Sequence, residues 1–237
     1  MKSLNQILKR AALASGVLLA GANAFALTDG PYTVSFPASG TTAVDFAGTM
    51  SFPKFNVGGG TLQSITFTLS GGLTAGQQFE NRGASAATIT VTTTGTMTLK
   101  RPDNSTLVVT IPQVVNSKLV SAFDGTIDFG GTSGFTFPDT AANLSQTQTY
   151  SGASDLALFS GAGNITLPVT AVGNSSGSGS ANVTISATLV GSSSATVTYT
   201  YSVAAVPEAS TYGAIGVVGL AGFIGYRRAR RKTAPVA

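Results

Sequence analysis

The sequence predicts an all-β protein: an antiparallel β-sandwich of about ten strands, preceded by a signal peptide and followed by a short C-terminal transmembrane helix. Composition is the first reason, because 33 Thr, 26 Ser and 29 Gly among 237 residues favour strands and tight turns over helices. The second is the alternation of apolar and polar residues through the middle of the chain. The third is that both ends combine basic residues with a short apolar run.

The N-terminal end, residues 1–26, has the three parts of a secretory signal peptide. Three basic residues in the first ten positions precede an apolar run, Ala11–Ala22, and the small residues Ala24 and Ala26 supply the signal-peptidase site. The alternative is a retained membrane helix, but about a dozen apolar residues are too few for a ~30 Å hydrocarbon core. We therefore expect export and cleavage.

The body, residues 27–205, is expected to form one sandwich domain whose short strands are joined by Gly-, Ser- and Pro-rich turns. The expected strands are Tyr32–Phe36, Ala43–Phe52, Ile65–Leu69, Ile89–Thr92, Thr96–Lys100, Thr106–Ile111, Leu119–Phe129, Thr147–Tyr150, Gly163–Thr170, Val183–Val190 and Ala195–Val203. The expected turns include Gly58–Gly60, Ser70–Gly72, Pro102–Asn104, Gly130–Gly131 and Ser175–Gly179.

Two local features of the body are more specific. The runs Val183–Val190 and Ala195–Val203 are predicted to pair as a hairpin across Gly191–Ser194. The segment Asp155–Phe159 breaks the alternation and is predicted to be a helical turn with Asp155 as its N-cap.

The C-terminal end, residues 206–232, has three parts in order: a polar box at 206–212, an apolar segment at 213–226 and a basic tail at 227–232. From Thr211 to Tyr226 the chain would span ~24 Å as a helix, which makes a short anchor. Basic residues resist translocation, so we expect the tail inside the cell and the body outside. The orienting residues are Arg227, Arg228, Arg230, Arg231 and Lys232.

This end resembles the PEP-CTERM sorting signal of Gram-negative bacteria. The box reads Val206-Pro207-Glu208-Ala209, with Ala209 where a second Pro is usual. The resemblance implies processing by an exosortase after a transient stay in the inner membrane, and delivery to the cell surface or the extracellular matrix, with exopolysaccharide as a partner.

The body is similar to the choice-of-anchor E domains, exported β-rich domains for which no common enzymatic activity or ligand is implied. The resemblance rests on the segments Gly60–Leu69, Ala122–Gly131, Asp155–Phe159 and Thr196–Tyr201.

The residue inventory excludes several functions. The chain has no Cys, His or Trp, which rules out disulfides, thiol redox chemistry and Cys or His metal sites. Of the 13 basic residues, only five lie in residues 27–206, against eight acidic ones, so the body carries a net charge of −3. A nucleic-acid partner is not expected, because such binding needs basic residues clustered on the folded domain.

Asp124 and Asp128 are the candidate metal ligands, flanking Gly125 and preceding Gly130–Gly131. In an extended strand they would be ~13 Å apart, too far for one ion unless the chain turns at Gly125. No cofactor is expected, and Ca²⁺ at this pair is the alternative.

The remaining candidates have ordinary structural interpretations. Glu80 near Arg82 is expected to form a surface ion pair or a turn. The pairs Tyr199/Tyr201 and Phe135/Phe137 are expected in the core, with sugar stacking as the alternative. We therefore expect a non-enzymatic surface or matrix protein with no catalytic residue. A carbohydrate- or calcium-binding adhesion module is the first alternative, and a weak hydrolase the second.

Overall fold

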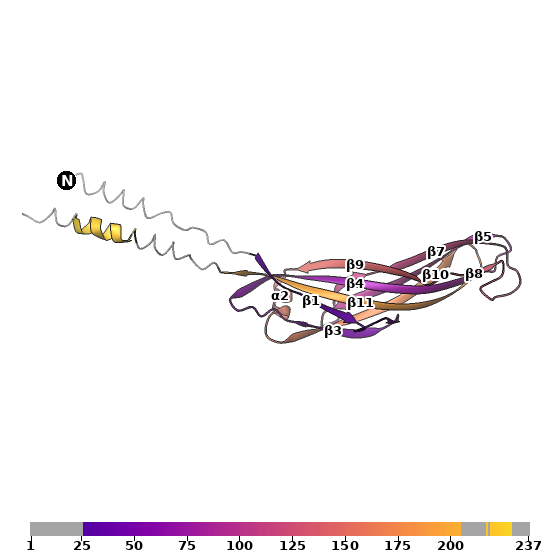
Figure 1. Cartoon of the computed structure of the whole chain (residues 1–237), viewed down its shortest axis with the longest axis horizontal. Helices are drawn as coiled ribbons and strands as arrows, with labels where there is room; N and C mark the ends of the chain where they lie inside the picture. The colour runs from indigo at the N-terminus through magenta and orange to yellow at the C-terminus, as the bar shows by residue number, and fades with distance from the viewer. Residues whose placement is uncertain (1–25, 205–216, 218, 229–237) are drawn as a thin grey trace, which may run out of the picture. The chain divides into compact units, whose positions relative to one another are not determined.

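The computed structural model describes residues 26–204, 217 and 219–228. The chain divides into two compact units, Leu27–Tyr201 and a second one composed of Met1–Ala26 with Ser202–Ala237. The first unit contains the strands and one short helix, α2, labelled in Figure 1. The elements are β1 (Ala26–Phe36), β2 (Thr42–Ala43), β3 (Ala47–Pro53), β4 (Gly60–Asn81), β5 (Ala87–Lys100), β6 (Thr106–Thr110), β7 (Gln113–Val120), β8 (Gly134–Thr136), β9 (Thr140–Tyr150), α2 (Ala153–Phe159), β10 (Asn164–Ser178) and β11 (Val183–Val203).

The strands form two antiparallel sheets, which confirms the predicted all-β class. Sheet A has the order β1-β11-β4, and β9 and β8 both pair with the far side of β4, while β2 pairs with β11. Sheet B has the order β3-β10-β5, with β6 and β7 both on the far side of β5. Each sheet is thus built on long central strands that are flanked by shorter ones.

The predicted hairpin across Gly191–Ser194 is wrong, because β11 runs through it as one strand of 21 residues. The expected turn Ser70–Gly72 likewise lies inside β4, a strand of 22 residues. In both places the inward-facing side chains stay on odd-numbered positions before and after the glycines, so the pleat of the strand continues without a break. Gly71 and Gly72 also pair with Leu144 and Asn143 of β9.

Three further expectations change in sheet B. The runs Ile89–Thr92 and Thr96–Lys100 belong to one strand, β5, and β10 continues through Ser175–Ser178 where a turn was expected. The predicted strand Leu119–Phe129 is wrong beyond Val120, where β7 ends. Gly125 and Phe129 adopt positive φ angles of 102° and 56°, which an extended strand does not permit.

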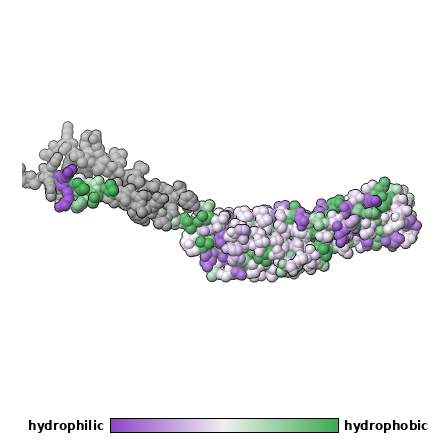
Figure 2. Space-filling model, in the orientation of Figure 1, coloured by the Kyte–Doolittle hydropathy of each residue, from purple (hydrophilic) through white to green (hydrophobic). Residues whose placement is uncertain are grey.

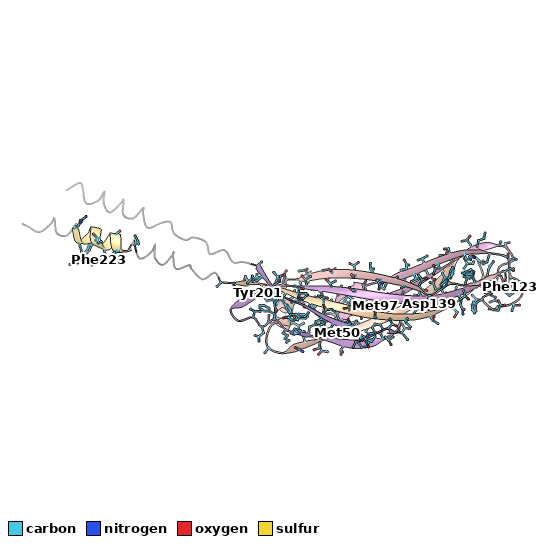
Figure 3. The ribbon with its side chains drawn as sticks, viewed as in Figure 1. Met50, Met97, Phe123, Asp139, Tyr201 and Phe223 are labelled. Carbon is cyan, nitrogen blue, oxygen red and sulfur yellow. The ribbon has the colours of Figure 1, made fainter. Side chains whose placement is uncertain are left out.

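The core between the sheets has three clusters. The largest, near α2, contains aromatic residues from both sheets, including Phe52, Phe67 and Tyr199. A small central cluster surrounds Leu73, and a third lies toward the other end of the sandwich around Phe79. Figure 3 labels Tyr201 and Phe123 at opposite ends of the sandwich.

Helix α2 confirms the predicted helical turn, but Gly152 rather than Asp155 is its N-cap. Asp155 instead accepts two hydrogen bonds from Arg101, from Nε at 2.7 Å and from Nη2 at 3.2 Å. This ion pair raises the pKa of Arg101 and ties the helix to the end of β5.

In the second unit, residues 219–228 are helical. Within the described part of the chain, no helix combines the length and the apolar character needed to cross a membrane. The signal-peptide residues before Ala26, with Ala24, lie outside the described residues. So do the box Val206-Pro207-Glu208-Ala209 and the basic residues Arg230, Arg231 and Lys232.

Candidate functional site

The outer face of sheet A is covered by hydroxyl groups. Because apolar side chains occupy the odd positions of β4 and β11, their even positions point outward, and these are mostly Ser or Thr. The outward hydroxyl residues are Thr33 and Ser35 on β1; Thr188, Ser192, Ser194, Thr196, Thr198 and Thr200 on β11; Thr66, Thr68, Ser70 and Thr74 on β4; and Ser145, Thr147 and Thr149 on β9. We call this set the hydroxyl face.

Neighbouring strands on the hydroxyl face are linked by hydroxyl pairs. Between β4 and β9 the oxygen atoms are 3.0 Å apart in Thr66–Thr149, 2.9 Å in Thr68–Thr147 and 2.7 Å in Ser70–Ser145. A similar pair joins Thr33 of β1 to Thr196 of β11 at 2.8 Å. Each hydroxyl has one proton and two acceptor lone pairs, so these pairs retain capacity for a further partner.

The hydroxyl face carries little charge. Strands β9 and β11 contain no Asp, Glu, Lys or Arg, and β4 has none before Glu80. Asp29 lies on β1, and the Asp139 carboxylate borders the face beside Thr188 at Gly76. Figure 2 shows the visible side of the sandwich as mostly pale, the colour of residues that are neither strongly hydrophilic nor hydrophobic. A surface of this kind offers hydrogen bonds without an electrostatic preference for either sign of charge.

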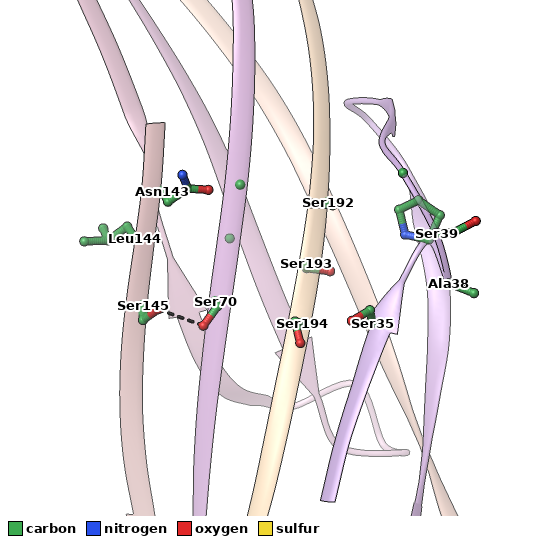
Figure 4. A pocket seen from close by; sticks show the side chains of 14 residues that line it. Ser35, Ala38, Ser39, Ser70, Asn143, Leu144, Ser145, Ser192, Ser193 and Ser194 are labelled. Atoms are coloured by element: carbon green, nitrogen blue, oxygen red, sulfur yellow. Dashed lines mark hydrogen bonds between the residues drawn. The ribbon is translucent and has the colours of Figure 1, made fainter. Parts of the chain in front are cut away.

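A hollow of about 300 Å³ lies in the middle of this face (Figure 4). Gly72 contributes no side chain there: a Cβ atom at this position would stand 3.0 Å from Asn143 Oδ1 and 3.3 Å from Ser192 Oγ. Ser70 and Ser194 lie beside it on β4 and β11. Polar atoms from three strands therefore converge on space that is left open by one glycine.

The predicted metal ligands Asp124 and Asp128 lie in the loop 121–133. Asp124 accepts hydrogen bonds from the backbone amides of Thr126, at 3.2 Å, and Thr132, at 3.1 Å, and these lower its pKa. Asp128 accepts one from the amide of Gly130 at 2.9 Å. Among the described residues, no three Asp, Glu, His or Cys side chains form a group that could hold a metal. The chain does turn at Gly125, and calcium at this pair stays a prediction.

Glu80 is not in a surface ion pair or turn, which corrects the expectation. It is fully buried in β4, where Ser133 Oγ donates to its carboxylate and the Phe129 amide donates to Oε2 at 3.0 Å. Its neighbour Asn81 donates to the carbonyls of Ser85 and Ser121. Glu80 and Asn81 thus fasten the 121–133 loop to the sandwich.

The aromatic candidates pack as expected. Tyr199 is buried, its hydroxyl donates to the Pro53 carbonyl at 2.7 Å, and burial raises its pKa. Tyr201 packs against Phe55, with ring centroids 5.2 Å apart. Phe135 and Phe137 contact each other edge to face in the cluster around Phe79.

Sequence reasoning missed the hydroxyl face, although the signal was present. Ser and Thr recur on alternate positions in Thr66–Ser70, Thr147–Thr149 and Ser192–Thr200. Period two predicts that the members of one run share a face. It does not say that three runs distant in the sequence lie on adjacent strands.

Neither a protein-family model nor a curated protein matches the chain. Several solved structures show weak similarity, among them the following three. The infectious bursal disease virus Gx strain structure has 10% identity and a TM-score of 0.21, covering 81% of this chain and 48% of the viral one. The VP2 subviral particle of that virus has 13% identity and a TM-score of 0.20, covering 78% and 38%. The tailspike protein of Acinetobacter baumannii phage AM24 has 15% identity and a TM-score of 0.14, covering 66% and 26%. This chain therefore spans less than half the length of each, and such scores carry no argument about function.

Proposed function

We propose that this chain is an exported, non-enzymatic protein of the cell surface or extracellular matrix, and that its hydroxyl face contacts neutral polysaccharide. The observation that carries the proposal is the hydroxyl face itself, whose strands β9 and β11 are uncharged, with the hollow at Gly72 near its centre. The proposed delivery of the protein rests on its two ends. Signal peptidase removes the signal peptide, and an exosortase processes the tripartite end at 206–232.

The chemistry of the face favours a neutral, polyhydroxylated polymer. Side chains on adjacent strands lie roughly 4.8 Å apart, and successive outward residues along a strand roughly 6.8 Å apart. The face is therefore a grid of groups that both donate and accept hydrogen bonds, as sugar hydroxyls do. An anionic polymer would be recognised through Lys or Arg, which β9 and β11 lack.

The test is to express the full chain in a Gram-negative host that has an exosortase, and to measure intact mass in the membrane, matrix and medium fractions. We expect an extracellular species that starts near Leu27, ends near Pro207 and is retained by the matrix. A chain that stays in the inner membrane with Arg227 still attached would contradict the sorting.

Two variants test the role of the hydroxyl face in matrix retention independently of the sorting of the chain. Gly72→Val fills the hollow without adding charge, and valine suits a strand. Thr96→Val on β5 of sheet B is the matched control. We expect Gly72→Val to reduce matrix retention roughly tenfold, the loss of roughly 1.4 kcal/mol of hydrogen bonding. If Gly72→Val does not accumulate, Ser192→Ala with Ser194→Ala removes the hydroxyls instead. Equal retention of all folded variants would contradict the role of the face.

A further inference from the structure

The lateral edges of the two sheets are not equally protected. Unpaired edge strands are pairing sites, and proteins block them with charges, prolines or side-chain plugs. Edge strand β1 contains Asp29 and Pro31. Just before β3 begins at Ala47, the Asp45 carboxylate accepts a hydrogen bond from the Gly173 amide of β10 at 2.8 Å. On β7, the Lys118 ammonium lies 4.7 Å from the centre of the Phe135 ring of β8.

Strand β9 has none of these devices. Its 11 residues, Thr140–Tyr150, include no charged residue, no Pro and no Gly. On one side it pairs with β4 from Ile65 to Ala75, and no described strand pairs with its other side. Most of its side chains are exposed.

Hydrogen bonding identifies which peptide groups of β9 point outward. In an antiparallel ladder the N–H and C=O of one residue point to the same side, and successive residues alternate. On β4 the Gln77 carbonyl accepts from the Phe137 amide at 2.8 Å and the Asn81 amide donates to the Ser133 carbonyl at 2.9 Å, so the odd-numbered residues of β4 direct their peptide groups toward the side of β8 and β9. Their ladder partners on β9 are even-numbered residues, so Ser145, Thr147 and Thr149 direct their peptide groups outward, and no partner for those groups is present among the described residues.

We infer that the β9 edge pairs with the β9 edge of a second copy of this chain, antiparallel across a two-fold axis at Thr147. In this register Thr147 of one copy exchanges backbone hydrogen bonds with Thr147 of the other, and Ser145 with Thr149 on each side of the axis, about six bonds in all. The register places Thr147 opposite itself on the outer face, and Ser145 opposite Thr149.

Two features of the strand favour a second copy as the occupant. A two-fold axis brings like residues together, so a charged edge would repel itself, whereas β9 is uncharged along its whole length. The new side-chain pairs would also repeat the hydroxyl pairs that already join β4 to β9, such as Thr68–Thr147 at 2.9 Å. The hydroxyl face would then continue from one copy into the next.

The experiment measures the mass of the full chain in detergent solution over a range of concentrations. We expect a concentration-dependent dimer. Thr147→Lys places two ammonium groups opposite each other and is expected to weaken dimerisation at least roughly tenfold. Thr198→Lys adds the same charge to the same face on the interior strand β11 and is expected to leave dimerisation unchanged.

Mixing variants tests the register. Thr147→Lys and Thr147→Glu should each be monomeric alone and should form a heterodimer when mixed, because Lys then faces Glu across the axis. A full chain that stays monomeric would overturn the inference. So would a dimer that Thr147→Lys leaves intact, or folded Lys and Glu variants that do not associate with each other. Melting temperatures of the variants establish that each is folded. These outcomes do not depend on polysaccharide, so they are distinct from the test of the proposed function.

Discussion

Near α2, the two sheets of the sandwich meet through aromatic rings, whereas toward the 121–133 loop hydrogen-bonded polar side chains flank the smaller apolar cluster around Phe79. At the first end Phe67 packs against Phe159, with ring centroids 5.2 Å apart. At the second, Gln77 of β4 donates to Thr93 Oγ1 of β5 at 2.8 Å and accepts from Asn116 of β7 at 2.8 Å. Burial of apolar area is non-directional, but hydrogen bonds require each partner in place. The stability of the polar end should therefore depend more on the chemical identity of each side chain, and the stability of the aromatic end more on side-chain volume.

The largest expected effect is at the aromatic end. Phe67→Ala removes a fully buried ring that also packs against Tyr150. It should lower the free energy of unfolding by about 3–5 kcal/mol, since the lost transfer energy and the cavity both contribute. Urea unfolding measures it. Val172→Ala, at a side chain that is 59% exposed, is the control and should stay within about 0.5 kcal/mol. Equal effects of the two would contradict the described core.

At the polar end, replacing a single side-chain atom should lower the free energy of unfolding. Glu80→Gln keeps the shape but replaces one acceptor oxygen with a donor, so the bonds from Ser133 Oγ and the Phe129 amide cannot both persist. We expect a loss of about 1–3 kcal/mol. Faster amide exchange should be confined to the 121–133 loop. Asp139→Asn makes the same chemical change at an exposed carboxylate and should have little effect. Uniformly faster exchange would argue against a local anchor.

The smallest expected effect is a response of the same loop to acid. Amides of Thr126 and Thr132 hold the pKa of Asp124 below its ordinary value of 3.8. A lowered folded-state pKa contributes stability that is fully present above the unfolded value and is lost as the pH falls through the folded one. Exchange of these two amides should therefore accelerate below about pH 4, relative to amides in the middle of β5. Asp124→Asn should abolish that acid dependence, and an unchanged dependence in the variant would assign it to another group.

Several parts of this fold were predictable because they depend on local pattern. The alternation in Ile65–Leu69 and Val183–Val190 correctly assigned strands and inward-facing side chains. The break in alternation at Asp155–Phe159 correctly located α2. The sorting residues, including Pro207 and Glu208, stay a prediction, because they lie outside the described residues.

Other parts were not predictable from local pattern. Gly71–Gly72 and Gly191–Ser194 have the composition of turns, yet both lie inside long strands. Their turn preference is weak, and ladder pairing with neighbouring strands overrides it. Glu80 appeared to be a surface residue because its partner Ser133 is 53 positions away in the sequence.

By itself the sequence determined the side of each strand on which a residue lies, because the side-chain period of a strand is two. It determined the neutrality of β9 and β11 as well, because that is a matter of composition. Only the tertiary structure decided that β1, β11, β4 and β9 lie next to one another and place their hydroxyl groups on one face. Strand order arises from contacts between residues far apart in the chain, such as Thr66 with Thr149, and no local pattern encodes such contacts.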